Sequence, residues 1–403
     1  ISLSSSTQYR VYGFYDDTRL TQFVNYSAGT LTLKNLFLND TSRWSATTFN
    51  QQSSQIRSEL KGLFTFSSDL DLVSGFEYRN GNIQGDYNKC ATCDASIDGL
   101  PPEKVKGGNN YSNINLGFYA QSTYKPIKSL NLTGGARVDN NTIRGISNTV
   151  LNVRAAAVWS PDKFVFKGIY STAFLEPTLF QKYATSASRL LNNPFLIPEK
   201  VANIDVSASY SLKDITLEFA FYNAKYSDVV NTNVVYDSTS GLPTTQFQST
   251  GALAIMGFQA GATYRIDNYS IYANFTYTNP KDDISGARIG DIAVSSFNAG
   301  MNAVLFDDLN ISLRSNYVGS KETGKTTTVK GNPMSSIDGY FLLSGTVSYF
   351  NIIESGISLQ LICNNILNTE YYDPGVRSAD NLIYASQIPQ NERNLTMRMI
   401  LDF

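Results

Sequence analysis

Apolar and polar residues alternate in short segments along the whole chain. Residues 269–278 are a clear example, in which Tyr269, Ile271, Ala273, Phe275 and Tyr277 alternate with Ser270, Tyr272, Asn274, Thr276 and Thr278. A period of two places successive side chains on opposite faces of a β-strand. The segments 130–138, 309–317 and 341–349 repeat the pattern. The alternation predicts a chain built from β-strands, but a soluble sandwich would show the same period.

The pattern predicts about eighteen strands, with boundaries good to about two to four residues. They lie near residues 5–15, 19–28, 30–38, 55–67, 70–84, 111–125, 129–143, 151–160, 164–174, 201–212, 215–231, 248–266, 269–280, 295–306, 309–320, 340–350, 356–367 and 395–403. Neither a helix nor a second domain is expected between them.

The connections between these segments alternate between short and long. Short links rich in Asp, Asn, Pro and Ser, the usual turn residues, occur at 67–69, 125–128, 160–163, 212–214, 266–268, 306–308 and about 351–355. Long loops occur near 39–54, 85–110, 144–150, 175–200, 232–247, 281–294, 321–339 and 368–394. Along antiparallel strands, this places all short turns at one end and all long loops at the other. Short periplasmic turns and long extracellular loops are typical of outer-membrane β-barrels, so the polarity favours a barrel over a sandwich.

The last segment, Leu395–Phe403, fits a membrane-spanning strand. Its apolar side chains fall at every second position, and about nine tilted residues are enough to cross the hydrocarbon core. Leu395, Met397, Met399, Leu401 and Phe403 are predicted to face lipid, whereas Arg398 and Asp402 face the lumen. A chain that ends on an aromatic residue resembles the closing strand of a bacterial outer-membrane barrel. That resemblance makes Phe403 an expected assembly signal for the barrel-assembly machinery.

The composition agrees with a wall between lipid and water. The chain has 25 Tyr and 23 Phe, and only 16% of its residues are charged, below the roughly 25% of ordinary soluble domains. No apolar run approaches the ~18 residues of a transmembrane helix. A net charge of −2 gives no argument for nucleic acid.

The absence of histidine restricts the possible chemistry. It excludes Ser-His-Asp and Cys-His nucleophiles, His-ligated zinc and imidazole acid–base catalysis. No pair of carboxylates has a spacing that predicts catalysis. We therefore expect neither an enzyme nor a bound cofactor.

Five local motifs, in order along residues 57–403, resemble those of TonB-dependent outer-membrane receptors. They are Tyr119-Ala-Gln121 with Tyr124 and Leu130–Asp139; Tyr170-Ser-Thr-Ala-Phe-Leu-Glu-Pro177; Asn193-Pro-Phe-Leu-Ile-Pro-Glu199; Asn364-Asn-Ile-Leu-Asn-Thr-Glu-Tyr-Tyr372; and Ile388–Arg393 before the terminal strand. Each motif is weak alone, but their order and placement make the resemblance strong. The family imports siderophores, cobalamin and glycans through a barrel of roughly 22 strands that encloses a plug domain.

The resemblance implies a function and a set of partners. Residues 1–403 are expected to form a single transmembrane β-barrel domain in the bacterial outer membrane, without the plug and about four strands of the family's full length. The implied activity is TonB-dependent import of a scarce bulky nutrient, first of all a ferric siderophore. The expected partners are TonB (through the plug segment), membrane lipid, lipopolysaccharide, and a metal chelate, corrinoid or glycan. The alternative is a passive porin-type channel without a plug.

Cysteines and aromatic residues supply the other candidate sites. Cys90 and Cys93 lie in a predicted extracellular loop, where a structural disulfide is expected and a thiolate site for copper or zinc is the alternative. Cys363 shares the parity of Leu359 and Leu361 and is predicted to be a lone lipid-facing or packed thiol.

The ligand candidates are aromatic residues at or in predicted loops, which suit siderophores, corrinoids or sugars, and arginines, which could bind an anionic ferric chelate. They are Tyr87, Tyr111, Tyr183, Tyr236, Arg377 and Tyr384, with Phe180, Tyr371, Tyr372, Arg79 and Arg189 as further possibilities. An aromatic girdle at the membrane interface, or packing within the loops, would use the same tyrosines. Contacts with lipopolysaccharide phosphates or with plug carboxylates would use the same arginines. We interpret Arg393 as structural. Lumen-facing positions are predicted for Arg137, Asp139, Asp205, Glu218 and Arg314.

Overall fold

The structure is a computed structural model of the whole chain. It describes residues 2–16, 47–90, 107–108, 111–183, 190–236, 243–306, 308–323, 334–350, 352, 356–375 and 385–401. Within the described ranges, side chains are described from residue 54 onward, except at 83–90, 107–108, 111, 180, 190 and 243–244.

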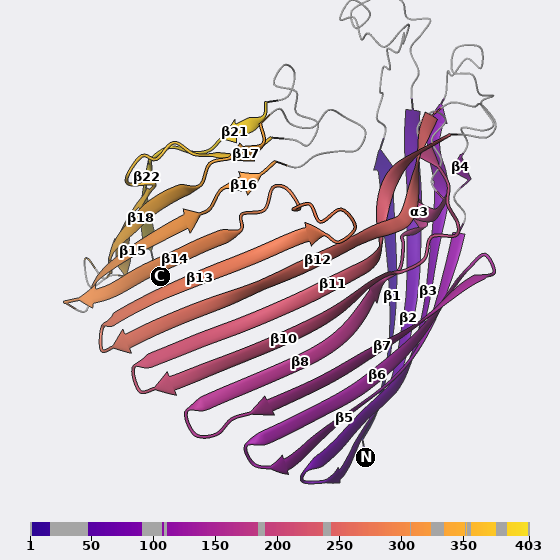
Figure 1. Cartoon of the computed structure of the whole chain (residues 1–403), viewed down its shortest axis with the longest axis horizontal. Helices are drawn as coiled ribbons and strands as arrows, with labels where there is room; N and C mark the ends of the chain where they lie inside the picture. Colours follow the sequence, from indigo (N-terminus) through magenta and orange to yellow (C-terminus); the bar gives the residue numbers. More distant parts are fainter. Residues whose placement is uncertain are drawn as a thin grey trace, which may run out of the picture.

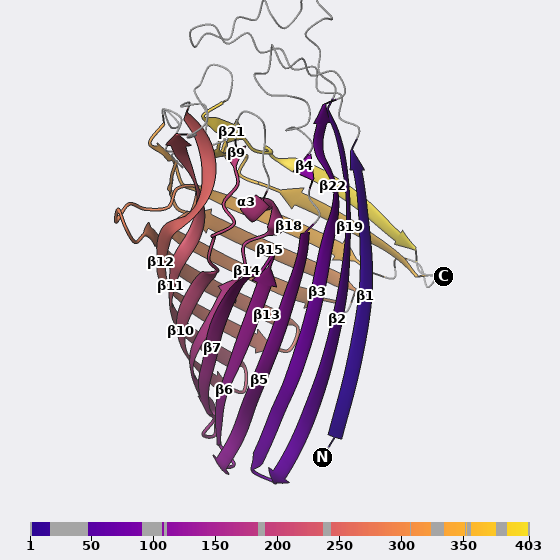
Figure 2. The same ribbon diagram turned by 90° about the vertical axis from the view of Figure 1, so that its right-hand side faces the viewer.

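Antiparallel strands dominate the fold and follow one another in chain order around a curved wall, which forms an open trough in Figures 1 and 2. The long strands are β1 (Ser2–Asp16), β2 (Thr47–Ser67), β3 (Leu70–Cys90), β5 (Tyr111–Ile127), β6 (Leu130–Ile143), β7 (Ile146–Trp159), β8 (Phe164–Leu175), β10 (Glu199–Leu212), β11 (Ile215–Tyr236), β12 (Pro243–Ile266), β13 (Tyr269–Asp282), β14 (Ser295–Leu305), β15 (Leu309–Val318), β18 (Tyr340–Tyr349), β19 (Ile357–Asn364) and β22 (Asn394–Leu401). They coincide with all the predicted strands except 19–28 and 30–38, which lie outside the described residues.

A few small elements sit between the long strands. Within the main sheet, β4 (Gly107–Gly108) pairs with β3, and β9 (Leu190–Leu191) pairs in parallel with β12. Two small sheets join β16 (Lys321–Glu322) to β17 (Ser336–Ile337) and β20 (Tyr372–Pro374) to β21 (Gln387–Pro389). The expectation that the chain has no helix was wrong, because α3 (Leu179–Tyr183) forms one short turn. Among the described residues, no helix has the length and apolarity to cross a membrane.

The predicted polarity of the connections is confirmed. Short turns join β2 to β3, β5 to β6, β7 to β8, β10 to β11, β12 to β13 and β14 to β15 at one end, which we call the turn end. The described parts of the longer connections, such as 176–183 and 283–294, lie at the opposite, loop end (Figure 1). The predicted long loop 144–150 was wrong, because Arg144 and Gly145 make a two-residue hairpin with φ of 51° and 80°. Positive φ at both positions matches the twist of the flanking strands.

Other predicted loops are shorter than expected because the strands continue into them. β2 begins at Thr47 within predicted loop 39–54, and β3 extends to Cys90 within predicted loop 85–110. Similarly, β11 runs to Tyr236 and β12 begins at Pro243. Backbone pairing with neighbouring strands holds these polar extensions, although they lack the alternation that marks the wall.

The two faces of the sheet have the predicted character. Alternate apolar side chains such as Leu60, Phe118, Leu151, Phe219 and Ile271 are exposed on the outer face. Cys363 pairs across the ladder with Gly345 and Leu395, which places it on this face as predicted from its parity. An outer surface of this kind suits contact with lipid.

Aromatic rings gather on the outer face near the turn end. Phe164 stacks on Phe166 with centroids 5.8 Å apart and lies 4.6 Å from Tyr210, while Trp159 stacks on Phe166 at 5.5 Å. Such a band is what an aromatic girdle at a membrane interface requires.

Glycines on the inner face make room for tyrosines from the next strand. A Cβ at Gly75 would lie 2.5 Å from the Tyr119 ring, and one at Gly257 or Gly300 would collide with Tyr222 or Tyr272. Each glycine lies beside its tyrosine in the ladder. The tyrosine therefore lies flat across a glycine, which lets its hydroxyl reach the strand beyond.

The sheet has two edges within the described residues. β1 pairs with β2, and β22 pairs with β19, but no pairing between β1 and β22 is seen in this part of the chain. The barrel-type order of strands is thus present, whereas closure of the cylinder is not seen between these two strands.

Candidate functional site

A cluster of charged side chains with two buried carboxylates occupies the inner face of β2, β3 and β6. The Glu77 carboxylate is 2% exposed and accepts from Arg57 Nη2 at 2.9 Å and Arg79 Nη2 at 2.7 Å. Arg137 Nη1 lies 3.6 Å from the same carboxylate and also donates through Nε and Nη2 to Asp139, at 2.7 Å each. A buried carboxylate needs such partners, because an unpaired charge in the interior costs several kcal/mol. We call these five residues the charged cluster.

Strand register assembles the charged cluster. Arg57 lies opposite Arg79 and Arg137 lies opposite Tyr119, so side chains of one parity meet on one face. The missing side chain of Gly117 leaves the space over which Arg137 and Asp139 lie. Tyr119 donates to Glu59 at 2.6 Å and extends the network toward the turn end.

The loop end of β8 separates from β7 but stays paired with β10 as far as Leu175, and the residues that follow lie over the charged cluster. The ladder between β7 and β8 ends at Arg154 and Ser171, and Thr172 Oγ1 then accepts from the Val153 amide at 2.9 Å. Beyond this point the chain turns into α3, which lies inside the trough (Figure 2). The carboxylate of Glu176 accepts from the buried Lys182 ammonium at 2.8 Å. Residues 174–179 and the charged cluster therefore enclose a shared cavity.

This cavity, the polar pocket, has a volume of about 540 Å³. It is lined by Arg57, Glu77, Arg79, Asn113, Asn115, Arg137, Asp139, Asn141 and residues 174–179. Among the described residues, Arg79 Nε, Asn113 Oδ1, Glu176 Oε2 and both side-chain polar atoms of Asn141 are buried without a hydrogen-bond partner. Each such atom costs about 1–3 kcal/mol if it stays unpaired. Asn141 is only 4% exposed.

Residues 192–197 of the connection between β8 and β10 are tied to β12. Asn193 Nδ2 donates to the Phe247 carbonyl at 2.9 Å, and Gln246 Nε2 donates to the Asn192 carbonyl at 3.0 Å. Ser249 bonds both the amide and the carbonyl of Ile197 at 3.2 Å. The Asn193–Glu199 motif is thus a strap that crosses from β10 to β12 and fixes the roof of the polar pocket.

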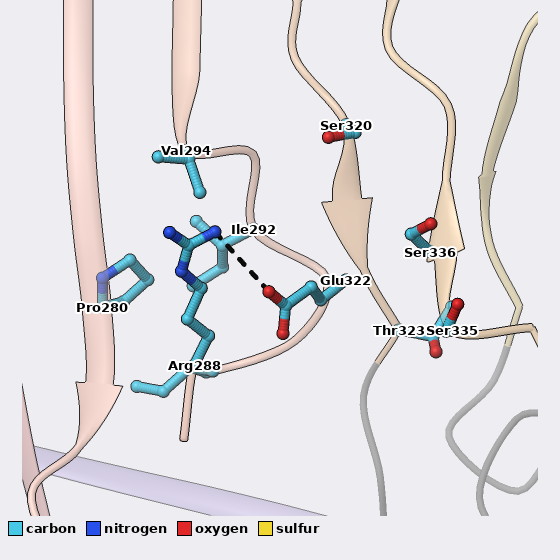
Figure 3. A pocket seen from close by; sticks show the side chains of 10 residues that line it. Pro280, Arg288, Ile292, Val294, Ser320, Glu322, Thr323, Ser335 and Ser336 are labelled. Carbon is cyan, nitrogen blue, oxygen red and sulfur yellow. Dashed lines mark ion pairs between the residues drawn. The ribbon is translucent and has the colours of Figure 1, made fainter. Parts of the chain in front are cut away.

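A second cavity, the loop pocket, lies among the connections at the loop end. Its volume is about 420 Å³, and its lining includes Pro280, Ile292, Val294, Arg288 and Glu322 (Figure 3). Arg288 Nη1 and Glu322 Oε1 are 3.5 Å apart across it. The pocket combines an apolar side with an exposed ion pair, so it offers weak and water-screened polar recognition.

The predicted ligand residues are not gathered into one site by the described structure. Tyr236 ends β11 and is 76% exposed, whereas Tyr183 is buried in α3 with the Arg144 guanidinium 5.8 Å from its ring centroid. Tyr87 and Tyr111 belong to β3 and β5 at the loop end. The side chains of Tyr87 and Tyr111, and the whole of Arg377 and Tyr384, lie outside the described residues. Ligand contact by these six residues stays a prediction.

The other predicted positions have mixed placements. Cys90 ends β3 opposite Thr47, but its side chain and Cys93 lie outside the described residues, as do Arg189, the side chain of Phe180, and Phe403. The Cys90–Cys93 disulfide and the assembly role of Phe403 therefore stay predictions. Tyr371 packs on Tyr340 at 4.6 Å, and Tyr372 begins β20. The Arg393 amide donates to Asn368 at 2.9 Å.

Lumen positions follow the predicted parity, and Arg79, a candidate ligand for an anionic chelate, is paired with Glu77 in the charged cluster. Sequence reasoning missed Glu77, Asn113, Asn141, Glu176 and Lys182 as site residues. Glu77, Asn113 and Asn141 share the inward parity of their own strands, which was the available signal. Nothing in the local pattern of Glu176 and Lys182 indicates that the chain folds inward there.

Comparison with known proteins agrees with this architecture. Residues 2–366 match the family model described as TonB dependent receptor-like, beta-barrel. Heme/hemopexin utilization protein C of Haemophilus influenzae is 23% identical over 176 residues, which cover 36% of this chain and 24% of that protein. The chain thus matches about a quarter of the length of this curated relative.

Solved structures share the fold at low sequence identity. A ferric enterobactin receptor (PfeA) from Pseudomonas aeruginosa, in complex with enterobactin, superposes with a TM-score of 0.74 at 15% identity, over 98% of this chain and 59% of that one. The copper transporter OprC superposes with a TM-score of 0.71 at 14% identity, over all of this chain and 62% of that one. The siderophore receptor PirA from Acinetobacter baumannii gives 0.70 at 15% identity, over 98% and 59%.

A family match over nearly the whole chain, together with the strand order and the alternating faces, identifies the molecule. The chain belongs to the TonB dependent receptor-like β-barrel family, a family of outer-membrane proteins.

Proposed function

We propose that this chain is the barrel wall of a receptor that imports a scarce, bulky nutrient across the bacterial outer membrane with energy from TonB. The family match over residues 2–366 carries the proposal. The wall supports it, since an apolar outer face and a polar inner face suit a lipid-embedded cylinder around a water-accessible lumen.

A ferric siderophore is the first substrate to test. Structures named as a ferric enterobactin receptor and a siderophore receptor share this fold, and a curated relative is named for heme and hemopexin use. The loop end supplies an ion pair in the loop pocket and the exposed Tyr236 as possible contacts for such a ligand. In this proposal the plug, pulled by TonB, opens the path, while the wall holds the loops in place.

Transport in cells tests the proposal directly. Cells that lack their own ferric-siderophore receptors would express the complete receptor, and uptake of ferric enterobactin and ferrichrome carrying radioactive iron would be followed with and without TonB. We expect uptake of one chelate that disappears without TonB. Uptake that persists without TonB would favour the passive channel instead. If neither chelate enters, the siderophore assignment is wrong.

Ligand contact by the loops has a separate test. A chelate that binds at the loop end is expected to protect loops 85–110, 175–200 and 368–394 of the complete receptor from protease. The tyrosine candidates are then tested one at a time by Tyr→Phe exchange at Tyr87, Tyr111, Tyr183, Tyr236 and Tyr384. A chelate that is transported but protects none of these loops would place its binding site elsewhere.

A further inference from the structure

Two lysines lie in one row on the outer face, toward the loop end of β11 and β13. Lys225 of β11 and Lys281 of β13 are both register partners of Ala254 on β12, so the three side chains point to the same side of the sheet. Lys281 shares the parity of Ile271, which is exposed on the outer face. Both lysines are exposed, and neither ammonium group has an ion pair or hydrogen bond with the described part of the chain. We call Lys225, Ala254 and Lys281 the lysine row.

The outer face changes from apolar to charged as it approaches the lysine row. The aromatic row consists of the register partners Phe221, Phe258 and Tyr277, and Phe258 stacks on Tyr277 with ring centroids 5.6 Å apart. The next row toward the loop end, the amide row, consists of Asn223, Met256 and Asn279. The lysine row follows it. Apolar surface, amide groups and ammonium groups therefore succeed one another in the same order as the acyl chains, the linkage and the headgroup of a membrane lipid.

The lysine row lies where the strands leave the hydrocarbon core. Lys225 is the eleventh residue of β11 and Lys281 the thirteenth residue of β13, counted from the turn end. A tilted strand crosses the core in about 9–11 residues, so both ammonium groups reach the headgroup level of the leaflet at the loop end. The backbones of β11 and β13 are two strand spacings apart, roughly 9–10 Å. Two flexible lysine side chains can therefore approach one phosphate group from both sides.

Neighbouring side chains at this level leave the charge of the lysine row uncompensated. Lys200 of β10 is already paired, with Nζ 3.4 Å from Asp228 Oδ2. Asp283, two residues beyond Lys281, makes no ion pair with either lysine of the row in the described structure. On the outer face of β6 and β7 the same level is neutral, because Asn140 Nδ2 donates to Thr149 Oγ1 at 2.8 Å. The lysine row thus presents free positive charge to the lipid headgroups, whereas these neighbours do not.

We propose that the lysine row binds a phosphate group of lipopolysaccharide in the leaflet at the loop end. Ammonium–phosphate contacts are charge-assisted and therefore strong. The amide row selects the kind of lipid. Asn279 Oδ1 is buried without a hydrogen-bond partner in the described structure, and rotation of the side chain would present this oxygen to a donor on a bound lipid. The ester linkages of a phospholipid only accept hydrogen bonds. Lipid A, the acylated and phosphorylated disaccharide of lipopolysaccharide, carries amide N–H and hydroxyl donors beside its acyl chains.

Lipid titrations of the complete receptor test the proposal. The delipidated receptor in neutral detergent would be titrated with bisphosphorylated lipid A, with the same lipid after removal of both phosphates, and with phosphatidylglycerol. Native mass spectrometry measures the fraction of receptor that carries each lipid. We expect bisphosphorylated lipid A to bind at least tenfold more tightly than either comparator. Equal binding of the dephosphorylated lipid would show that no phosphate is recognised. Equal or tighter binding of phosphatidylglycerol would assign the row to a phospholipid and overturn the proposal.

Variants locate the lipid on the wall. The double variant Lys225→Gln with Lys281→Gln should weaken binding of bisphosphorylated lipid A at least tenfold, and Asn279→Leu should weaken it several-fold. Lys167→Gln is the matched control, because Lys167 is an exposed lysine on the inner face of β8, and it should leave binding unchanged. Lys225→Arg with Lys281→Arg keeps both charges and should retain binding.

Unchanged affinity in the double glutamine variant would overturn the proposal. Loss of affinity in the double arginine variant as well would mean that positive charge at these positions is not what holds the lipid. Both lysines are exposed and unpaired in the described structure, so the substitutions leave the packing of the wall intact. Binding is measured without TonB and without a nutrient, so this result stands apart from the transport proposal.

Discussion

The inner face of the wall uses two different chemistries in its two halves. On β2, β3 and β6 the buried carboxylates Glu77 and Asp139 are held by arginines from three strands. On β11 to β15 the corresponding contacts are neutral, such as Tyr222 with Thr278 and Asn316 with Asn298. Glu218, Arg265 and Arg314, which are charged residues on the inner face of that half, are exposed.

The difference shows that alternation determines the face on which a side chain lies. It does not determine how much the burial and pairing of that side chain contribute to stability. A buried ion-pair network is costly to interrupt, because loss of one partner leaves a charge away from water. A neutral hydrogen bond is worth about 0.5–1.5 kcal/mol, and its loss is a local event. The first half of the wall is therefore expected to respond more strongly to single substitutions than the second half.

The largest effect is expected from Arg137→Met. It removes both bonds to the buried Asp139 carboxylate and the contact with Glu77. Because water reaches part of the site, we expect a loss near the lower end of the range for broken buried pairs, about 3 kcal/mol. Urea unfolding of the complete receptor, followed by tryptophan fluorescence, measures it. The control is Arg314→Met, an exposed arginine with no ion pair among the described residues, which should change stability by less than about 0.5 kcal/mol. Equal losses of stability in Arg137→Met and Arg314→Met would show that the two halves of the wall do not differ in their response to substitution.

Glycine substitutions test a feature that both halves share, which is the packing of a tyrosine ring across a glycine of the next strand. A Cβ at Gly75 would lie 2.5 Å from Tyr119 Cζ and 2.8 Å from the Leu60 carbonyl, and one at Gly257 would meet the Tyr277 carbonyl. Overpacking of this kind costs roughly 1–3 kcal/mol, so Gly75→Ala and Gly257→Ala should both destabilise by about 2 kcal/mol. In contrast, Gly81 on β3 has nothing within 4 Å of an added Cβ, and Gly81→Ala should be neutral or slightly stabilising. The same unfolding assay measures all three variants. If Gly81→Ala lowered the free energy of unfolding as much as Gly75→Ala, the loss could not be assigned to collision of the added Cβ with its neighbours.

Removal of single hydroxyls gives a finer comparison. Tyr119→Phe loses a bond to the Glu59 carboxylate at 2.6 Å, whereas Tyr222→Phe loses a bond to the neutral Thr278 hydroxyl. Hydrogen bonds to charged groups are the stronger kind. We expect a loss of about 1.5 kcal/mol for Tyr119→Phe and about 1 kcal/mol or less for Tyr222→Phe. A lower denaturant midpoint for Tyr222→Phe than for Tyr119→Phe would contradict the expectation that the bond to the Glu59 carboxylate is the stronger one.

The smallest effect is expected in a loop, where a carboxylate is satisfied by neutral donors. Asp282 ends β13, beyond the roughly ten residues that cross the membrane. The Ser285 amide at 2.7 Å, with the Ser285 hydroxyl and the Ile284 amide, lowers the pKa of Asp282 below its ordinary value of 3.8. A lowered folded-state pKa contributes stability that is present above pH 3.8 and is lost as the pH falls through the folded value.

Hydrogen exchange of the Ile284 and Ser285 amides can measure this effect. After correction for intrinsic rates, their protection should stay constant from pH 7 to about pH 4 and fall only in stronger acid. In Asp282→Asn the protection should not depend on pH. A loss of protection already near pH 5 would mean that the Asp282 pKa is not lowered.

Much of the wall could be predicted from local sequence. The alternation in segments such as 130–138 and 309–317 gives both the strand and its two faces, because each side chain's face depends only on its position within the strand. The short turns could be predicted for the same local reason, since Asp, Asn and Pro act through their own backbone. The Arg144–Gly145 hairpin was missed because Arg-Gly is not among the common two-residue turn sequences.

The candidate site could be predicted only in part. The inward parity of Arg137 and Asp139 was available from the sequence, but their partner Glu77 comes from a strand about sixty residues earlier. Which inward residues meet depends on the register between strands. The β7–β8 ladder ends at Ser171, and β8 stays paired with β10 to Leu175 before residues 176–179 turn inward. No residue in the local pattern marks that point.

The sequence by itself therefore determined the β-strand class, the lipid and lumen faces, the turn end and the loop end, since all of these follow from side-chain alternation and turn chemistry. Only the tertiary structure decided that Glu77 and Asp139 are buried, that tyrosines cross glycines, and that Asn141 lines a cavity with unmatched hydrogen bonds. The physical reason is that burial and hydrogen-bond partners are set by strands distant in the chain. A local pattern cannot specify them.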